Sequence, residues 1–417
     1  MAGISRLLRL AGYPRLLDAP PGAHAVGTRR PRLPGSLYCE LSYPAAPRGE
    51  AAQSYFRPEA IAGLAEFAHM SEGLFHSVLT TNHPGAAGAP VLKGSWPMCA
   101  PLAASDAACP PGSDVPVTEV VFIHGLGGCA EMYSQLCMSL ASFGYIVFAI
   151  EHEDGSGCHA TTERGETIRY RRPPEGLEDS REGCISFRKS FLSQRSHELR
   201  SALLCLSRGL PPNLEDIYAN ADLSAGIDLV GHSFGAASAL CFIDEMERYP
   251  YEPDIPKVRS VVLLDPWLKP VREQLLTRGV RNELLCIVSE AWATDSELML
   301  HIHTLLTNST APRVALWAPN TGHQSVSDAQ TWAPSIVARL MKTLGRNEKR
   351  HATQLACAAA CHDFFVSLQL EQQQKPCAAH DRAPLSAHPL ASGVLEPLPL
   401  SQVEHLLAAK PGSQREQ

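Results

Sequence analysis

The stretch Gly231-His232-Ser233-Phe234-Gly235 decides the fold of this chain because of what lies on either side of it. The apolar run 227–230 favours a strand before it, and the alanine-rich run 236–240 favours a helix after it. Strand, tight turn and helix form an elbow that presents the serine hydroxyl at the end of a sheet. Both glycines are needed, since a side chain would collide with the neighbouring strand or helix. Ser233 is therefore a candidate nucleophile.

Apolar runs and helix-forming runs alternate on both sides of this elbow. The expected strands are 117–123, 146–150, 227–230, 258–264, 284–289 and 314–317, and the expected helices are 131–142, 187–207, 236–240, 296–306 and 333–344. Largely apolar strands separated by helices indicate a parallel sheet covered on both faces. The sequence therefore predicts a doubly wound α/β architecture.

The two ends of the chain differ in composition from this alternating region. Residues 1–35 are rich in Pro, Gly and Arg, and we expect an extension that is either disordered or a targeting segment. Residues 36–371 should form one domain, which begins with a strand at 36–43 and ends with a helix at 353–370. Residues 372–417, rich in Gln, Pro, Ala and Ser, should form a low-order tail.

Composition excludes several classes of protein. The formal net charge of −7, with no long cluster of lysine or arginine, argues against a nucleic-acid partner. The 13 cysteines are scattered singly, which indicates reduced thiols in a reducing compartment, with the cytoplasm as the expected location. The arginine-rich start leaves organelle targeting open. No apolar run is long enough to span a bilayer, and the sequence gives no indication of the oligomeric state.

A serine nucleophile needs a base, and the base needs a carboxylate that holds it in the right tautomer. On an elbow fold the acid and then the histidine follow the serine in the chain. His323 lies in a loop directly after the strand 314–317, which brings it to the carboxyl edge of the sheet. Two acids end strands at the same edge, Asp265 and Glu290, and the residues alone leave both open.

Acyl transfer also needs donors aimed at the developing oxyanion. One should be the backbone N–H of Phe234, which follows the candidate nucleophile. The second should come from the glycine-rich loop 124–128, where we choose Leu126. His124 and His232 are interpreted as structural residues that bond to neighbouring loops.

The remaining histidines give no convincing metal site. Glu151-His152-Glu153-Asp154 resembles a ligand cluster on paper, but His152 and His159 lie seven positions apart on an expected loop. His301 and His303 cannot share one face of a helix. We expect no metal and no cofactor, and we interpret these residues as a polar rim at a strand end.

Six stretches together resemble the platelet-activating factor acetylhydrolase family, the plasma and type II cytosolic group of serine esterases. They are 122–127, 144–147, 151–152, 231–235, 264–267 and 322–324. The resemblance covers most of the chain between the front extension and the tail, and it implies an α/β-hydrolase fold. In that family the acid lies in an Asp-x-Trp pattern after the strand that follows the nucleophile helix. Asp265 with Trp267 matches that pattern, so the resemblance favours Asp265 over Glu290.

The resemblance also implies a function. It implies calcium-independent hydrolysis, of the phospholipase A2 type, of the sn-2 acetyl or short oxidised acyl ester of platelet-activating factor and related glycerophospholipids. The alternatives are a carboxylesterase or neutral-lipid hydrolase of the same fold, and a lipid-binding protein without turnover. Both enzymatic readings use the same triad, so the choice between them depends on the substrate.

A peripheral contact with the membrane surface is a further implication. In relatives an amphipathic helix ahead of the first oxyanion loop meets the lipid surface, and residues 61–79 occupy that position here. The candidates for insertion are Leu74, Phe75, Val78 and Leu79. Packing of these four side chains into the core is the alternative.

Overall fold

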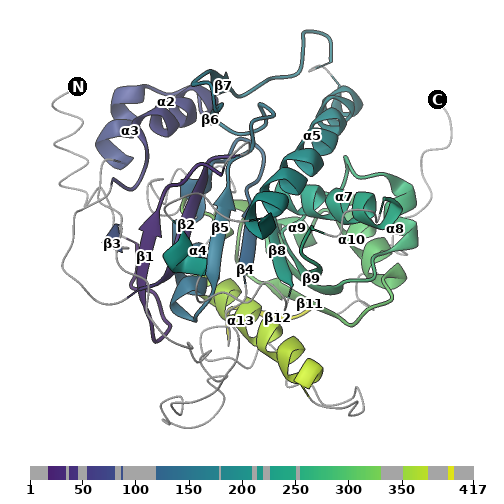
Figure 1. The fold of residues 1–417 in the computed structure, drawn as a ribbon. Helices are drawn as coiled ribbons and strands as arrows, with labels where there is room; N and C mark the ends of the chain where they lie inside the picture. Colours follow the sequence, from purple (N-terminus) through teal and green to yellow (C-terminus); the bar gives the residue numbers. More distant parts are fainter. Residues whose placement is uncertain are drawn as a thin grey trace.

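The computed structural model describes most of the central region of the chain (Figure 1). The described residues are 17–33, 37–45, 54–79, 86–87, 119–177, 180–208, 214–218, 226–249, 254–329, 351–373 and 393–398. The expected helix at 333–344 lies outside these residues, as does nearly all of the expected connection at 82–116.

A ten-stranded sheet runs through the molecule in the order β12-β11-β10-β9-β8-β4-β5-β2-β1-β3. Its strands are β1 (Ala25–Arg29), β2 (Cys39–Ala45), β3 (Ala86–Ala87), β4 (Glu119–Ile123), β5 (Ile146–Ile150), β8 (Ile227–His232), β9 (Val258–Leu264), β10 (Glu283–Ser289), β11 (Arg313–Ala318) and β12 (Glu396–Pro397). The run from β5 to β11 is parallel, whereas β2 and β12 pair antiparallel with their neighbours. A separate antiparallel pair joins β6 (His159–Thr161) and β7 (Thr167–Arg169).

The central strands are apolar because both of their faces are buried. In β4, Val120 and Phe122 point to one hydrophobic cluster, and Val121 and Ile123 point to the other. This alternation is what a pleated strand produces when helices cover both faces of the sheet. The structure confirms the predicted α/β class.

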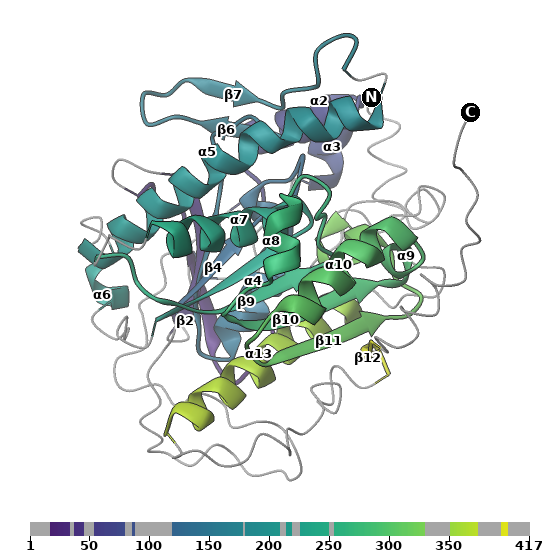
Figure 2. The same cartoon turned by 90° about the vertical axis from the view of Figure 1, so that its right-hand side faces the viewer.

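Helices cover the two faces of the sheet (Figure 2). One core cluster is built with α2 (Pro58–Phe67), α3 (Glu72–Leu79), α4 (Ser134–Ser142) and α13 (Ala352–Gln373). The other is built with α5 (Arg181–Arg208), α7 (Phe234–Arg248), α8 (Glu273–Arg278) and α10 (Ser296–Asn308). Shorter helical turns are η1 (Ala130–Tyr133), α6 (Glu215–Tyr218), α9 (Glu290–Ala293) and η3 (His323–Val326). None of the described helices has the length and apolar character that a bilayer crossing requires.

The sheet extends beyond the expected domain at both ends. Strand β1 lies before residue 36 and pairs antiparallel with β2, which corrects the expectation that residues 1–35 are all an extension. Its apolar pattern is weak because a glycine stands at position 27. A Cβ there would lie 2.5 Å from the Tyr43 ring, so no larger residue fits. Strand β12 pairs with β11 inside the expected tail. Both segments are short. The apolar pattern of β1 is broken at Gly27, and the partner strand of β12 lies far earlier in the chain.

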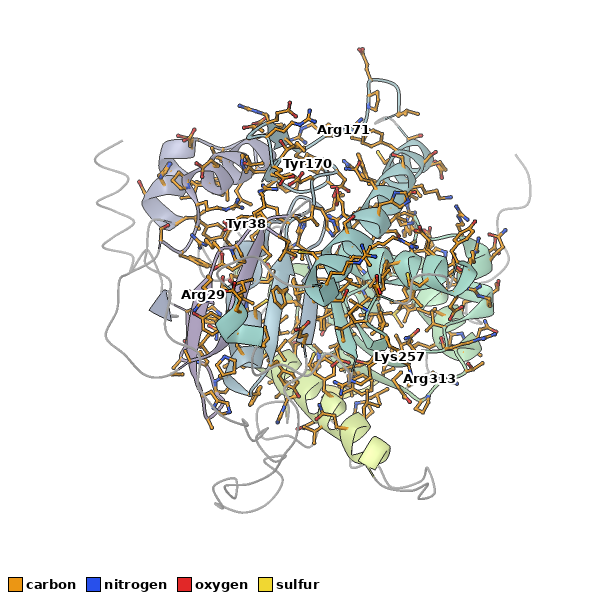
Figure 3. The ribbon with its side chains drawn as sticks, in the orientation of Figure 1. Arg29, Tyr38, Tyr170, Arg171, Lys257 and Arg313 are labelled. Atoms are coloured by element: carbon orange, nitrogen blue, oxygen red, sulfur yellow. The ribbon has the colours of Figure 1, made fainter. Side chains whose placement is uncertain are left out.

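The direction of the parallel strands fixes where loops gather. Lys257 and Arg313 mark the amino ends of β9 and β11, on the side of the molecule away from Tyr170 and Arg171 (Figure 3). The loops after β4, β8, β9, β10 and β11 therefore meet at the opposite, carboxyl edge. Open α/β sheets form their sites at this edge.

Candidate active site

Ser233 lies at a sharp turn between β8 and α7. Its backbone has φ 55° and ψ −115°, a conformation that residues other than glycine rarely adopt. A Cβ on Gly231 would lie 2.5 Å from the backbone of Gly235, and one on Gly235 would overlap the carbonyl oxygen of Ile123. The tight approach of strand, turn and helix therefore explains both glycines of the pentapeptide.

A chain of two hydrogen bonds joins the three predicted triad residues. His323 Nε2 lies 3.0 Å from Ser233 Oγ, and His323 Nδ1 lies 2.8 Å from Asp265 Oδ2. The carboxylate of Asp265 is buried and accepts two further bonds, from the N–H and the hydroxyl of Ser289, at 2.6 and 2.7 Å. In this arrangement Nδ1–H donates to Asp265, which leaves Nε2 free to accept the serine proton.

Glu290, the alternative acid, lies elsewhere. It begins α9, and its Oε2 accepts a hydrogen bond of 2.6 Å from the backbone N–H of Asn320. It therefore supports the loop that carries His323, whereas Asp265 contacts the imidazole itself. The structure brings Asp265, and not Glu290, together with His323 and Ser233.

The loop after β4 carries a candidate backbone donor and passes close to the serine. A Cβ on Gly125 would lie 3.2 Å from the Cβ of Ser233, so the loop passes close to the nucleophile. Gly127 has φ 69° and donates to the carbonyl of Ser156 at 2.7 Å, which fixes the far side of the turn. Among the described residues, the N–H groups of Leu126 and Phe234 have no hydrogen-bond partner. Two donors are thus available beside Ser233.

His232 links the two loops that flank the serine. Its Nε2 donates to the carbonyl of His323 at 3.0 Å, and its Nδ1 accepts from the Tyr133 hydroxyl at 2.9 Å. Tyr133 in turn accepts from the N–H of Gly125 at 3.2 Å. Burial holds the pKa of His232 well below its ordinary value, so the ring stays neutral. The carbonyl of His323 accepts only from a protonated Nε2, which sets the tautomer.

Sequence reasoning missed several residues that contact this site. The indole of Trp292 stacks on the imidazole of His323, with ring centroids 3.7 Å apart and an angle of 5° between the planes. Ser289 and Tyr133 bond to the site as described above. Ser289 carried a usable signal, since it ends a predicted strand at the carboxyl edge. Trp292 and Tyr133 carried none, because their positions relative to the site depend on how distant segments pack.

The predicted interfacial residues divide into buried and half-buried positions. Phe75 and Leu79 are 6% and 1% exposed and belong to the hydrophobic core, which corrects their assignment as insertion residues. Leu74 is half-buried, and the side chain of Val78 lies outside the described part of the structure. Within residues 61–79, Met70 between α2 and α3 is the exposed large apolar residue among the described side chains.

The candidate metal residues around Glu151 have protein partners. Glu151 pairs with Arg57, His152 Nδ1 lies 2.6 Å from Glu198, and His159 bonds to Thr161. The three-residue group with ligand-like spacing in the described region is His232, Asp265 and His323, which the triad geometry already uses.

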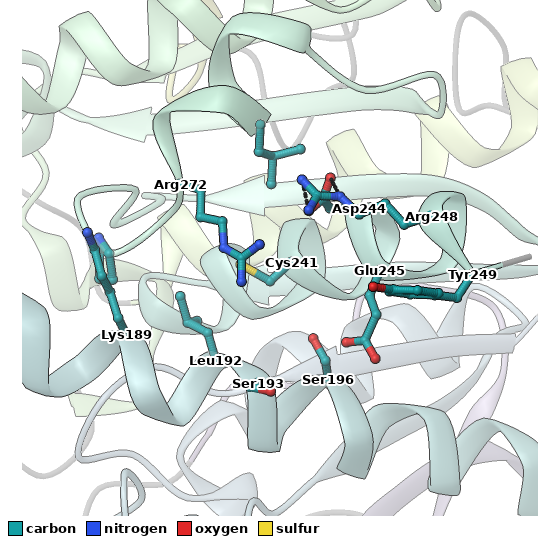
Figure 4. Close-up of a pocket in the computed structure, with 12 residues that line it drawn as sticks. Lys189, Leu192, Ser193, Ser196, Cys241, Asp244, Glu245, Arg248, Tyr249 and Arg272 are labelled. Carbon is teal, nitrogen blue, oxygen red and sulfur yellow. Dashed lines mark hydrogen bonds and ion pairs between the residues drawn. The ribbon is translucent and has the colours of Figure 1, made fainter.

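A separate pocket of about 460 Å³ lies between α5, α7 and the loop before α8 (Figure 4). The Asp244–Arg248 ion pair forms part of its wall, together with Lys189 and Arg272. None of the triad residues lines it. This pocket is therefore distinct from the candidate active site.

Fold and site together define the class of protein. A solved ferulic acid esterase from Streptomyces cinnamoneus superimposes with a TM-score of 0.58 at 19% identity, covering 93% of this chain and all of that chain. The shared fold, the parallel sheet and the strand–turn–helix elbow at Ser233 are those of an α/β hydrolase. Residues 57–379 match the family model described as platelet-activating factor acetylhydrolase, isoform II. The chain belongs to this family.

Individual relatives match over shorter stretches. The platelet-activating factor acetylhydrolase of Gallus gallus is 27% identical over 299 residues, which is 65% of this chain and 66% of that protein. The Bos taurus protein of the same name is 30% identical over 199 residues, covering 43% and 41%. A putative phospholipase A2 of Schizosaccharomyces pombe is 26% identical over 199 residues, covering 40% and 44%. The chain thus aligns with about two fifths to two thirds of the length of these relatives.

Proposed function

We propose that this protein is a serine esterase that hydrolyses the sn-2 acetyl or short oxidised acyl ester of platelet-activating factor and related glycerophospholipids. The observation that carries the proposal is the hydrogen-bonded array of Ser233, His323 and Asp265 on a strained elbow. Membership of the acetylhydrolase family supports the choice of a phospholipid substrate over other esters.

The proposed reaction follows from the positions of these groups. Ser233 Oγ attacks the ester carbonyl carbon while His323 Nε2 takes the hydroxyl proton. The N–H groups of Leu126 and Phe234 stabilise the oxyanion of the tetrahedral intermediate. His323 then gives the proton to the leaving oxygen of the lysophospholipid, and water hydrolyses the acyl-enzyme by the same route. Asp265 orients the imidazole throughout and stabilises its charged form.

We further propose that turnover needs no calcium and takes place at the surface of lipid aggregates. The triad generates its own nucleophile by proton transfer, so the reaction requires no bound cation to activate water. A cytoplasmic location is proposed from the cysteine pattern, and peripheral membrane contact from the family resemblance. The observations for them are the cysteines scattered singly along the sequence and the exposed Met70.

The test is labelling followed by a substrate panel. A fluorophosphonate probe should label the wild-type protein and not Ser233→Ala, whose kcat on an acetylated ether phospholipid should fall on the order of a million-fold. Excess EGTA should leave the wild-type rate unchanged. Wild-type protein that is not labelled would instead be a binding protein, and labelled protein that prefers triglyceride would be a neutral-lipid hydrolase. Retained hydrolysis by Ser233→Ala would refute the mechanism.

A further inference from the structure

A buried guanidinium lies directly behind the proposed oxyanion site. Arg195, on the inner side of α5, is completely buried, although an arginine in a polar helix is usually a surface residue. Its charge is balanced by Asp154, whose Oδ2 lies 3.2 Å from Nε, and the ion pair has no exposure to solvent. Burial tends to raise the pKa of Asp154, but the guanidinium lowers it below its ordinary value. Such a pair is costly to desolvate, so the stability of the fold does not by itself explain why a buried ion pair lies at this position.

Arg195 contacts the first donor loop before Leu126 and is linked to it after Leu126 through Ser156. Nη1 donates to the carbonyl of His124 at 2.8 Å. Nε and Nη2 donate to the hydroxyl of Ser156 at 2.9 and 2.6 Å, and the carbonyl of Ser156 accepts the N–H of Gly127. The peptide that carries the Leu126 N–H therefore lies between two points that Arg195 holds, one directly and one through Ser156.

The same guanidinium contacts the second donor segment. Its central carbon lies 4.8 Å from the centroid of the Phe234 ring, within the range of a cation–π contact. Nη1 also lies 3.3 Å from the hydroxyl of Ser238, and this hydroxyl donates to the carbonyl of Phe234 at 2.8 Å. One rigid, planar group thus touches both segments that carry the proposed oxyanion donors.

We propose that Arg195 is a positioning residue that holds the Leu126 and Phe234 donors at the spacing required by the oxyanion. The proposal rests on the proposed ester hydrolysis, and it adds a residue that touches neither the substrate nor the nucleophile. The fork of the guanidinium matters because it reaches His124, Ser156 and Ser238 at once, which the single ammonium of a lysine cannot do.

The test compares two buried arginines. Arg195→Lys keeps a positive charge beside Asp154, and Arg195→Met removes it. The control is Arg259→Met. Arg259 is also buried and paired with an aspartate, Asp228, but it lies near the amino ends of the parallel strands, away from Ser233. All rates are expressed per active site, counted by titration with a fluorophosphonate. Substrates are the acetylated ether phospholipid and p-nitrophenyl acetate, and a trifluoromethyl ketone serves as an inhibitor that forms an oxyanion on Ser233.

Displaced donors should lower transition-state stabilisation and leave substrate binding intact. We expect kcat of both Arg195 variants to fall about 10- to 100-fold with little change in KM. The Ki of the trifluoromethyl ketone should rise by the same factor. The Arg259 variant should keep the wild-type kcat and Ki per active site. If Arg195→Met does not fold, Arg195→Lys decides the question.

Three outcomes would overturn the proposal. In the first, kcat and Ki of the Arg195 variants stay within about two-fold of wild type. In the second, kcat of the Arg195 variants falls but Ki is unchanged. In the third, kcat of the Arg259 variant falls as much as kcat of the Arg195 variants. Failure of the proposed phospholipid activity is distinguishable, because the p-nitrophenyl acetate and trifluoromethyl ketone measurements do not depend on the lipid. Wild-type protein that reacts with neither reagent would contradict the proposed esterase function.

Discussion

Two buried aspartates lie at opposite ends of the parallel strands of the sheet, and their surroundings differ. At the carboxyl edge, Asp265 follows β9 and bonds to His323 and Ser289. At the amino edge, Asp228 in β8 pairs with Arg259 and accepts a hydrogen bond of 2.5 Å from the hydroxyl of Ser260. Both carboxylates are buried and have donors on both oxygens.

The backbone separates the two clusters. Asp265 has φ 47°, Ser233 has φ 55°, and Asn320, three residues before His323, has φ 59°. The Asp228 cluster lies within the paired strands β8 and β9, whose register shifts between Ile227 and Asp228. Positive φ angles and two unpartnered N–H groups thus occur together in the candidate site, whereas none of Asp228, Arg259 and Ser260 has a positive φ. The comparison teaches that a buried charged cluster by itself does not mark a site. Backbone strain at three residues around the Asp265 cluster is what supports the hypothesis of a site there.

The largest expected effect separates the two carboxyl-edge acids. Asp265→Asn should lower kcat on the order of 10⁴-fold, because an amide facing Nδ1 favours the wrong imidazole tautomer. Glu290→Gln is the matched control and should lower kcat only a few-fold, since the amide oxygen can still accept from Asn320. Steady-state kinetics on the acetylated ether phospholipid provide the measurement. A larger loss in Glu290→Gln than in Asp265→Asn would reverse the assignment of the acid.

The second prediction breaks the amino-edge cluster. Arg259→Met should lower the free energy of unfolding by about 3–5 kcal/mol, because it leaves Asp228 buried without a countercharge. The kcat per active site should stay at the wild-type value, since no group of the triad moves. Urea denaturation and active-site titration measure the two quantities. A fall in kcat as large as the one expected for Arg195→Lys would show that the two edges are coupled.

The smallest expected effect concerns Asp328, five residues after His323. Its carboxylate accepts from the Tyr55 hydroxyl at 2.5 Å and from Gln354 on α13 at 2.8 Å. Burial raises its pKa from 3.8 to about 7. Between those two values the native state binds more protons than the unfolded state, so the free energy of unfolding should fall as pH rises toward 7. Above pH 7 the contribution of this group should level off.

The measurement compares wild type with Asp328→Asn. Between pH 5 and 8 the free energy of unfolding of the wild type should fall on the order of 1–3 kcal/mol relative to that of the variant. Urea denaturation at each pH measures it. Burial also raises the pKa of Glu151 and Glu198 to about 8, but these groups are present in both proteins and cancel in the difference. Parallel stability profiles for the two proteins would contradict a raised pKa at Asp328.

Much of the fold was predictable because it follows local patterns. The parallel strands are continuous apolar runs, and each appears within a few residues of the expected bounds, as β9 does at Val258–Leu264. Strand β1 was not predictable, because Gly27 and the polar Thr28 break the apolar alternation. The burial of Phe75 and Leu79 was not predictable either, since an apolar helical face has the same pattern whether it packs on a core or on a lipid surface.

The candidate site divides in the same way. Ser233 and His323 follow from motifs and from the rule that parallel strands end at one edge. Arg195 resembles a surface residue in the sequence, and its partners Asp154 and Ser156 lie about 40 positions earlier in the chain. A sequence pattern carries no information on such pairings, because they arise when a helix and a distant loop pack together.

The sequence by itself determined the elbow at Ser233, the alternation of strands and helices, and the edge at which the reactive side chains gather. These properties depend on neighbours within a few residues. The tertiary structure decided between Asp265 and Glu290, which local patterns left open and the family resemblance favoured in the same sense. It alone decided that Trp292 stacks on the imidazole and that Arg195 lies behind both donor segments. Two residues that end adjacent strands have the same local pattern, and only the three-dimensional path of the loops after them sets their distance from His323.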